Sequence, residues 1–390
     1  MDIPHQRAAV ISQAGAVLYD ALGVVSYMYQ FLSHQCANLI IKIEIHKKNP
    51  LYFCISNKNA YLCESGKEDR SILRCNDMKK ILYYIIYPLW YLASLMPLRI
   101  HYILSDIIYL IVCYVIRYRN KVIRNNLSTS FPGKSPEEIR QIQKKFYRWF
   151  SDYLVESVKL LTISEDELRR RMVFKGTDTV DEVVKSGQSC AVYLGHYCNW
   201  EWITSLPLWV CEEAQCGQIY HPLENEEFDR LFLRIRQRFG AVCIAMNDTL
   251  RKIIEYKRAN KQVVIGYISD QVPFWNNIHH WTDFLNHDTP VLSGTERIAR
   301  SADHAVFYLD VRRIKRGYYE AEFKLITKEP KKMAEFEITD IYFAKLEESI
   351  RRAPEFWLWS HNRWKRTREK FNKRFEVRDG KVYKKADAEQ

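Results

Sequence analysis

The segment LGHYCNWEW, residues 194–202, contains the two side chains whose types and spacing best suit catalysis, His196 and Glu201. An imidazole can take a proton from a hydroxyl near neutral pH, and a carboxylate bonded to its second ring nitrogen stabilises the imidazolium. If a strand ends at Gly195 and a helix starts near Asn199, we expect the Glu201 carboxylate to reach back to His196. The same spacing is also typical of a hydrogen-bonded core histidine beside an unrelated glutamate, so this pair alone leaves both interpretations open.

A zinc site is an alternative interpretation of the same segment. His196, Cys198, Cys211 and Cys216 are chemically acceptable zinc ligands. However, Cys211 and Cys216 flank the polar stretch EEAQ, and Cys198 falls in the expected first turn of an apolar helix, where a small buried thiol is common. The sequence therefore favours packing roles for these cysteines and predicts no metal site.

Two arginines of the segment 219–240, IYHPLENEEFDRLFLRIRQRFG, are candidates for holding an anion. Apolar residues form one face of the predicted helix, and Arg236 and Arg238 lie on its flanks. Flanking arginines can bind a phosphate or a developing oxyanion, but they are equally typical of surface arginines whose stems cover apolar neighbours.

Asp270 and the helix that follows Ser293 are further candidates. Asp270 comes directly after the apolar run VVIGYI, where polar side chains often enter the site of an α/β sheet but also cap turns. Ser293 and Glu296 fit a capping box at the start of a helix that carries Arg297 and Arg300. The N-terminus of that helix can bind an anion, although most such boxes simply begin a helix. His279 and His280 are predicted to be loop residues without an evident partner.

Buried strands that alternate with helices must position these residues. The runs CAVYLG, AVCIA and VVIGYI have strand length and are separated by helical segments, and Ser135 with Glu138 predicts a capping box on a long amphipathic helix. We therefore predict an α/β domain with a mixed, mostly parallel sheet flanked by helices. His196 and Asp270 each follow a strand, at the edge of the sheet where such domains carry their sites.

The composition indicates a phosphate-rich partner. Lys and Arg exceed Asp and Glu by 59 to 47 in 390 residues, a net charge of +12, which favours nucleic acid, an anionic membrane surface, or an acidic substrate or carrier. Aromatic residues make up 14% of the chain and favour the membrane surface. The 10 cysteines are irregularly spaced without a C-x-x-C pair, which is typical of reduced thiols facing the cytoplasm.

An N-terminal hydrophobic membrane anchor is expected over residues 78–117. Ile81–Leu98 is free of charge and covers about 27 Å as a helix, slightly less than the hydrocarbon core, and Pro88 is expected to kink it. The shorter run Ile103–Ile116 contains Asp106 and ends in basic residues, which favours the cytoplasmic side. Both a spanning and an interfacial anchor fit this pattern.

The remaining chain divides by composition. Residues 1–77 form an atypical N-terminal extension, and we hypothesise that Met78 is the biological start because the anchor pattern begins there. Residues 118–366 form the predicted α/β domain, and residues 367–390 form a basic tail.

Taken in order, these blocks resemble the bacterial lipid A biosynthesis acyltransferase family. The resemblance covers about residues 78–366 and rests on the aromatic anchor, RNNLSTSFP, GHYCNWEW, YHP with FDRLFLRIRQRFG, SDQ, PVLSGTERIAR and PEFWLWSHNRWK. It implies a glycerol-phosphate-acyltransferase-like domain that moves a fatty acyl chain from an acyl thioester, of acyl carrier protein or coenzyme A, to a hydroxyl of a lipid A precursor. It also implies a place at the bacterial inner membrane with the catalytic domain facing the cytoplasm. Acyl carrier protein and a membrane glycolipid are the expected partners, with no cofactor, metal or nucleic acid.

The resemblance also implies roles for individual residues. His196 is the expected general base and Glu201 its orienting partner. The other expected site residues are those for the oxyanion or substrate, Arg236, Arg238 and Asp270, and those for phosphate or carrier contacts, His221, Arg297 and Arg300. His221 stands where the family commonly has an arginine. Two other functions stay open: acylation of a lysophospholipid or another lipid, and non-catalytic binding of membranes or nucleic acid by a basic protein.

Overall fold

The computed structural model describes residues 53–56, 59–62, 83–84, 86–223, 225–378 and 380–385. The described chain divides into two compact units, Met1–Leu95 with Leu223–Phe232, and Met96–Pro222 with Leu233–Gln390. In the first unit, strands β1 (Phe53–Ser56) and β2 (Asn59–Leu62) pair antiparallel. The predicted extension over residues 1–77 otherwise lies outside the described residues.

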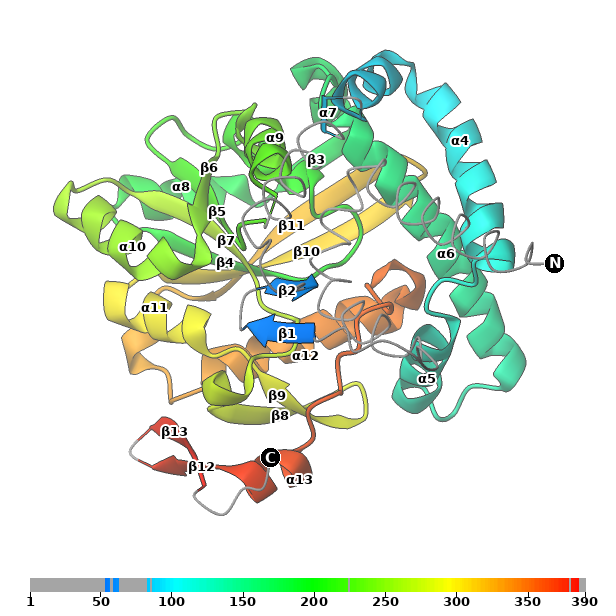
Figure 1. The fold of residues 1–390 in the computed structure, drawn as a ribbon. Coiled ribbons are helices and arrows are strands. Elements are labelled where there is room, and N and C mark those ends of the chain that lie inside the picture. The colour runs from blue at the N-terminus through cyan, green and yellow to red at the C-terminus, as the bar shows by residue number, and fades with distance from the viewer. Residues whose placement is uncertain are drawn as a thin grey trace. The chain divides into compact units, whose positions relative to one another are not determined.

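The second unit contains a seven-stranded mixed sheet in the order β3-β11-β10-β4-β7-β5-β6 (Figure 1). Its strands are β3 (Met172–Lys175), β4 (Cys190–Leu194), β5 (Gln215–Tyr220), β6 (Val242–Ala245), β7 (Val263–Ile268), β10 (Ala305–Lys315) and β11 (Tyr318–Thr327). Neighbouring strands from β10 to β6 run parallel, β11 runs antiparallel to β10, and β3 is parallel to β11. This arrangement confirms the predicted α/β class with a mixed, mostly parallel sheet.

Helices flank the sheet, and two short hairpins accompany it (Figure 1). The helices are α4 (Leu98–Leu110), α5 (Asn120–Ser130), α6 (Pro136–Lys159), α7 (Glu165–Arg171), α8 (Thr177–Lys185), α9 (Glu226–Gln237), α10 (Thr249–Arg258), α11 (Gly294–Ala302), α12 (Glu337–Arg352) and α13 (Arg368–Arg374). The short helical turns are η1 (Ile111–Val115), η2 (Trp202–Leu208), η3 (Met246–Asp248), η4 (Trp275–Asn277), η5 (Pro330–Lys332) and η6 (Pro354–Phe356). The hairpins join β8 (His280–Phe284) to β9 (His287–Val291) and β12 (Phe375–Arg378) to β13 (Lys381–Lys384).

One of the two predicted capping boxes is present. Ser135 caps α6, where its hydroxyl accepts from the Glu138 amide and the Glu138 carboxylate accepts from the Ser135 amide. The box predicted at Ser293 is wrong, because Ser293 makes no side-chain cap bond. The Glu296 carboxylate is buried and accepts instead from the amides of Phe336 and Thr339, so it ties α11 to the start of α12.

The helix that meets the length and hydropathy expected of a membrane span differs from the first predicted run. Among the described residues it is Leu98–Val115, formed by α4 and η1. Residues 86–95 are helical with Pro88 inside, and the helix is interrupted at Met96 and Pro97 rather than at Pro88. The interruption follows because Pro97 has extended backbone, with ψ of 146°, at the N-cap of α4.

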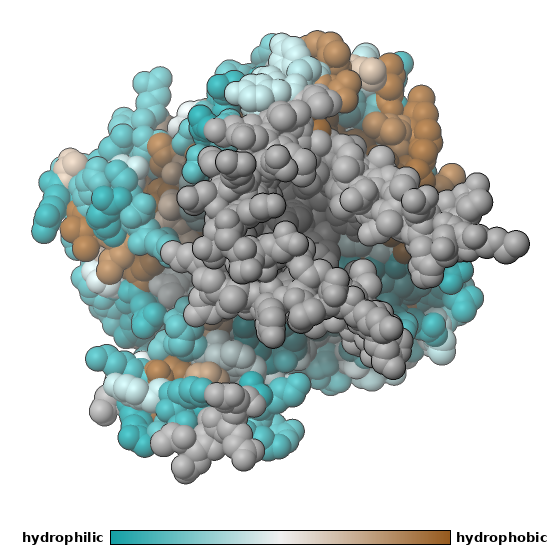
Figure 2. Space-filling view, in the orientation of Figure 1, coloured by the Kyte–Doolittle hydropathy of each residue, from teal (hydrophilic) through white to brown (hydrophobic). Residues whose placement is uncertain are grey.

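Helix α4 lies beside α6 (Figure 1), and polar side chains of α4 bond residues of α6. Tyr102 donates to Glu156 at 2.9 Å, and Ser105 donates to Asp152 at 2.6 Å. The apolar side is left uncovered among the described residues, and Figure 2 shows the apolar side chains gathered at this edge. The exposed apolar residues of this side, which we call the α4 apolar face, are Ile100, Ile103, Leu104, Ile107, Leu110, Ile111, Tyr114, Val115 and Ile116.

Candidate active site

His196 and Asp270 meet because two neighbouring strands end in register. Strand β4 pairs parallel with β7, and Leu194 lies opposite Ile268 at their carboxyl ends. His196 and Asp270 each lie two residues further along the chain. The two side chains contact each other through His196 Nδ1 and Asp270 Oδ1, 2.6 Å apart, and they are 5% and 2% exposed. The edge of the sheet predicted to carry the site therefore holds a buried histidine–aspartate pair.

The Asp270 carboxylate is held in one orientation by donors on both oxygens. Its Oδ2 accepts from the His196 amide at 2.9 Å and from the Trp357 indole at 2.8 Å. Burial raises the pKa of Asp270, but the charge of His196 and the hydrogen bonds from His196 and Trp357 outweigh it and lower that pKa to about 2. Asp270 is therefore ionised at neutral pH and suited to stabilise a protonated His196 ring.

The backbone around His196 is fixed by the C-terminal segment 356–358. The Cys198 amide donates to the Phe356 carbonyl at 2.9 Å, and the Leu358 amide donates to the His196 carbonyl at 3.2 Å. This short bridge brings Trp357 to Asp270. Gly195 completes the turn, since a Cβ there would lie 2.8 Å from Leu346 Cδ1. The loop is thus defined by contacts far apart in sequence.

Cys198 has a packing role, as the sequence favours, but outside a helix. It lies in the loop before η2, with a left-handed φ of 54° and no exposed surface, and its thiol points to the Val311 carbonyl. Burial raises the pKa of the Cys198 thiol well above its usual value. The described residues contain no group of three or more side chains arranged to hold a metal ion.

The predicted contact between Glu201 and His196 is wrong. Both Glu201 oxygens accept from Arg236, at 2.9 Å from Nε and 2.7 Å from Nη2, and both side chains are buried. The carboxylate that contacts the histidine is instead that of Asp270, two residues beyond the end of β7. The physical reason is that helical structure begins only at Trp202, so Glu201 is the N-cap of η2 and points to α9.

Replacing Glu201 by Ala should lower the free energy of unfolding by about 3–5 kcal/mol, because it leaves the Arg236 guanidinium buried without its counter-charge. The double variant Glu201→Met with Arg236→Met should recover most of that loss, since it removes both buried charges together. Urea unfolding followed by tryptophan fluorescence measures both values. If the double variant is as unstable as Glu201→Ala, the loss of stability does not come from an unpaired buried charge, and the prediction is wrong.

Arg238 makes its hydrogen bonds at the end of α6, and its role at the oxyanion or substrate stays a prediction. Its guanidinium donates to the backbone carbonyls of Leu160 and Ile163, the second at 3.1 Å, just past the C-terminus of α6. Carbonyls at a helix end lack partners within the helix, and a guanidinium satisfies two of them at once. Burial lowers the pKa of Arg238. The contacts of Arg238 are those of a structural residue.

The three residues predicted to contact phosphate or carrier come from two places in the chain, the end of β5 and helix α11. His221 is exposed at the carboxyl end of β5, where its Nδ1 lies 2.9 Å from the Pro222 carbonyl oxygen. Arg297 is exposed on α11. Arg300 donates to the Ala334 carbonyl at 2.8 Å and lies 3.6 Å from the Glu296 carboxylate. Their role in binding stays a prediction. His280, predicted to lack a partner, begins β8 and contacts Asp340 at 2.8 Å.

Sequence reasoning missed three residues beside the pair. Trp357 donates to Asp270, the Gln271 amide nitrogen lies 3.3 Å from His196 Nε2, and His361 Nε2 accepts from the Val272 amide at 3.3 Å. Trp357 and His361 belong to the segment PEFWLWSHNRWK, whose density of aromatic and basic residues was the available signal. Its distance from His196 along the chain hid the contact.

The buried carboxylate of Glu156 also supports this loop. Glu156 on α6 accepts from Asn199 and from Tyr319, each at 2.7 Å, and the Asn199 side-chain oxygen Oδ1 accepts from the Trp202 amide. Burial, opposed by the charge of Arg313 and by hydrogen bonds, raises the pKa of Glu156 to about 7. Glu156 therefore joins the loop after His196 to the helix that packs against α4.

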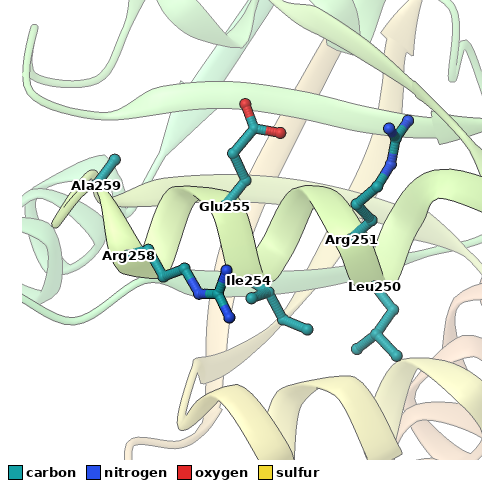
Figure 3. A pocket seen from close by; sticks show the side chains of 6 residues that line it. All are labelled: Leu250, Arg251, Ile254, Glu255, Arg258 and Ala259. Carbon is teal, nitrogen blue, oxygen red and sulfur yellow. The ribbon is translucent and has the colours of Figure 1, made fainter.

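A surface hollow also lies along α10, lined by Leu250, Arg251, Ile254, Glu255, Arg258 and Ala259 (Figure 3). All six lining residues come from or directly follow one helix, and none is among the predicted site residues. The hollow therefore contributes nothing to the histidine–aspartate site.

The fold and the site together define an α/β enzyme with a histidine–aspartate pair at the carboxyl edge of its sheet. The chain belongs to the bacterial lipid A biosynthesis acyltransferase family, whose model matches residues 73–366. This finding confirms the resemblance noted from the sequence blocks.

Two curated relatives show a weaker similarity. A lipid A biosynthesis myristoyltransferase of Escherichia coli (strain K12) and a lipid A biosynthesis acyltransferase 1 of Shigella flexneri are each 22% identical to it over 135 residues. Each match covers 34% of this chain, and the chain spans about two fifths (41%) of the length of each relative.

Proposed function

We propose that this protein transfers a fatty acyl chain from an acyl thioester to a hydroxyl of a lipid A precursor. The observation that carries the proposal is the buried His196–Asp270 pair, with the Nδ1 side of the ring held by Asp270. A histidine oriented in this way leaves Nε2 to act on the acceptor. The family match supports the acyl-transfer chemistry and the lipid A pathway.

The reaction needs two proton transfers, one from the acceptor hydroxyl to His196 and one from His196 to the leaving thiolate. His196 Nε2 takes the proton of the acceptor hydroxyl while its oxygen attacks the thioester carbonyl. The C–O bond forms, the C–S bond breaks, and the leaving thiolate takes the proton from the imidazolium. Asp270 stabilises the imidazolium that exists between these steps, and no covalent acyl-enzyme is needed.

The acyl donor is proposed to be the thioester of acyl carrier protein or coenzyme A, with no further cofactor. Both donors carry phosphate, and acyl carrier protein is acidic, which suits a chain with a net charge of +12. Measuring kcat/KM with each thioester in turn shows which of the two is the preferred donor.

The protein is proposed to act at the bacterial inner membrane with its catalytic domain on the cytoplasmic side. The α4 apolar face supports membrane contact. The polar side chains Tyr102 and Ser105 of α4 are hydrogen-bonded to α6 instead. Basic residues Arg117, Arg119 and Lys121 follow directly after η1, as expected on the cytoplasmic side. A helix packed along the domain on one side suits an interfacial position.

Replacing Ile103 and Ile107 by Lys should weaken partitioning onto anionic phospholipid vesicles by about tenfold or more, because lysine is far costlier than isoleucine in the apolar part of a bilayer. Vesicle co-sedimentation measures the change. Leu250→Lys is the matched control, since Leu250 is 57% exposed on α10, apart from α4. Equal partitioning of the double variant and the wild type would contradict membrane contact through α4.

The proposed function is tested by incubating the protein with an acyl thioester and defined acceptors. The expected result is acylation of the lipid A precursor with kcat/KM at least 100-fold above that for a lysophospholipid, on the order of the discrimination that hydrogen bonds to a sugar acceptor provide. Preferred acylation of the lysophospholipid would support the alternative acceptor. Salt-sensitive nucleic-acid binding without any transfer would favour a non-catalytic basic protein.

A further inference from the structure

The segment 359–366 lies against the loop that carries Asp270. The Val272 amide donates to His361 Nε2 at 3.3 Å, and Arg366 Nη1 donates to the Pro273 carbonyl at 2.7 Å. From the other side, Arg119 Nη1 donates to the Ser360 carbonyl at 2.7 Å. These contacts place a basic segment directly beyond Gln271, whose amide nitrogen lies 3.3 Å from His196 Nε2.

Several nitrogen atoms of the cations in this segment lack hydrogen-bond partners among the described residues. Lys365 is half-buried, and the charges that act on it are those of Arg366 and Arg119, while Arg366 Nε is buried without a hydrogen-bond partner in the described chain. Arg363 is fully buried, and its Nε and Nη1 also lack partners in the described chain. Burial first, and then the charges of Arg366 and Arg119, lower the pKa of Lys365. Crowded and partly desolvated cations are costly unless an anion joins them.

The backbone conformation that brings Arg119 to this segment is energetically unfavourable. Arg117 and Arg119 have left-handed φ values of 53° and 48°, which residues with a Cβ seldom adopt. They flank the buried Tyr118 and reverse the chain between the end of η1 and the start of α5. Strain of this kind is often retained where it positions a functional group.

We propose that Arg119, Lys365 and Arg366 bind the phosphate monoester of the membrane glycolipid acceptor. The identity of the lipid rests on the proposed function. A phosphate on these cations would hold the sugar beside Gln271 and present its hydroxyl to His196. Arginine and lysine together match this ligand, because guanidinium groups bond phosphate oxygens in pairs and ammonium adds a point charge.

The position of Arg119 favours a lipid phosphate over the phosphate of the thioester donor. Arg119 follows Val115 and Ile116, the last exposed residues of the α4 apolar face, by only a few positions. Basic residues next to a membrane-contacting helix lie at the depth of lipid headgroups. The contact assigned here differs from the predicted one at His221, Arg297 and Arg300.

The test is equilibrium binding of glycolipid to the full-length chain in neutral detergent micelles, without a thioester donor. Two acceptors are compared, one with its phosphate monoester and one treated with phosphatase. The wild type should bind the phosphorylated lipid about 10- to 100-fold more tightly, the range of one to two charged hydrogen bonds. Lys365→Glu should reduce this ratio to about one, and Lys365→Arg should retain it. The double variant Lys257→Ala with Arg258→Ala, exposed on α10, controls for net charge and should leave the ratio unchanged.

Equal binding of the two lipids by the wild type would overturn the proposal, and so would a ratio that Lys365→Glu leaves unchanged. The KM for the thioester shows whether these cations bind the phosphate of the donor rather than that of the lipid. Lys365→Glu should leave that KM within about twofold, and an increase equal to the loss in lipid binding would assign the cations to the donor phosphate instead. Because binding is measured without turnover, a failure of acyl transfer does not alter this outcome. Thermal unfolding of Lys365→Glu within a few degrees of the wild type shows that the fold is intact.

Discussion

Asp270→Asn should lower kcat for acyl transfer by about 10²–10⁴-fold while the protein stays folded. The carboxylate accepts from His196 Nδ1 at 2.6 Å, so the wild-type ring carries its proton on Nδ1 and leaves Nε2 to take one from the acceptor. An asparagine amide donates to Nδ1, which moves the ring proton to Nε2 and blocks the base. It also loses the negative charge that stabilises the imidazolium. Steady-state kinetics with a saturating thioester measure the fall.

Asp288→Asn is the matched control for this prediction. Asp288 is an exposed aspartate on β9 that forms an ion pair with Arg368. Its substitution therefore removes one carboxylate charge from a pair that bonds neither His196 nor Asp270. It should leave kcat within about twofold. Because the pKa of Asp270 is about 2, the carboxylate stays ionised as pH falls to about 4, and any loss of wild-type activity above that pH belongs to another group. Asp270→Asn with more than a tenth of wild-type kcat would contradict the pairing.

His196→Ala should abolish transfer to within the background rate, a loss of about 10²–10⁴-fold or more. The substitution removes the group proposed to take the proton from the acceptor hydroxyl, and the other side chain that bonds Asp270, the Trp357 indole, is a donor that cannot act as a base. The double variant His196→Ala with Asp270→Asn should be no slower than His196→Ala alone, because the two residues act as one unit. Single-turnover transfer to the lipid A precursor measures both.

Folding of His196→Ala must be shown separately, because the ring is 5% exposed and its backbone bonds Asp270 and Leu358. Those bonds come from main-chain atoms and persist in the variant. Near-ultraviolet circular dichroism, which reports the packed tryptophans near the site, should match the wild type. A folded variant that transfers acyl chains at the wild-type rate removes His196 from the base role.

The fold could be predicted because buried strands and amphipathic helices have distinct apolar periods. The runs that became β4, β6 and β7 are short and apolar, and Ser135 with Glu138 marked the start of α6. The family match also followed from ordered blocks. The candidate membrane helix Leu98–Val115 lies within the anchor predicted over residues 78–117, but apolarity alone does not show that α4 begins after Pro97 or that a helix contains Pro88.

The site was only partly predictable. Strand ends placed His196 and Asp270 at one edge of the sheet, but their contact depends on the order of strands, which puts β4 beside β7. Glu201 was chosen as the partner because it is close in sequence, whereas its carboxylate is taken by Arg236 from α9. Trp357 was missed for the converse reason. Its bond to Asp270 joins residues 87 positions apart, and no local pattern encodes it.

The central claim is that this chain acylates a lipid A precursor through His196. Mass spectrometry of lipid A tests it most directly, in cells that lack the protein and receive either the wild-type chain or His196→Ala at equal abundance. The account predicts that the wild type adds the mass of one acyl group to the precursor and that His196→Ala adds none. Lipid A that is identical in both strains, or acylated equally by His196→Ala, would contradict it.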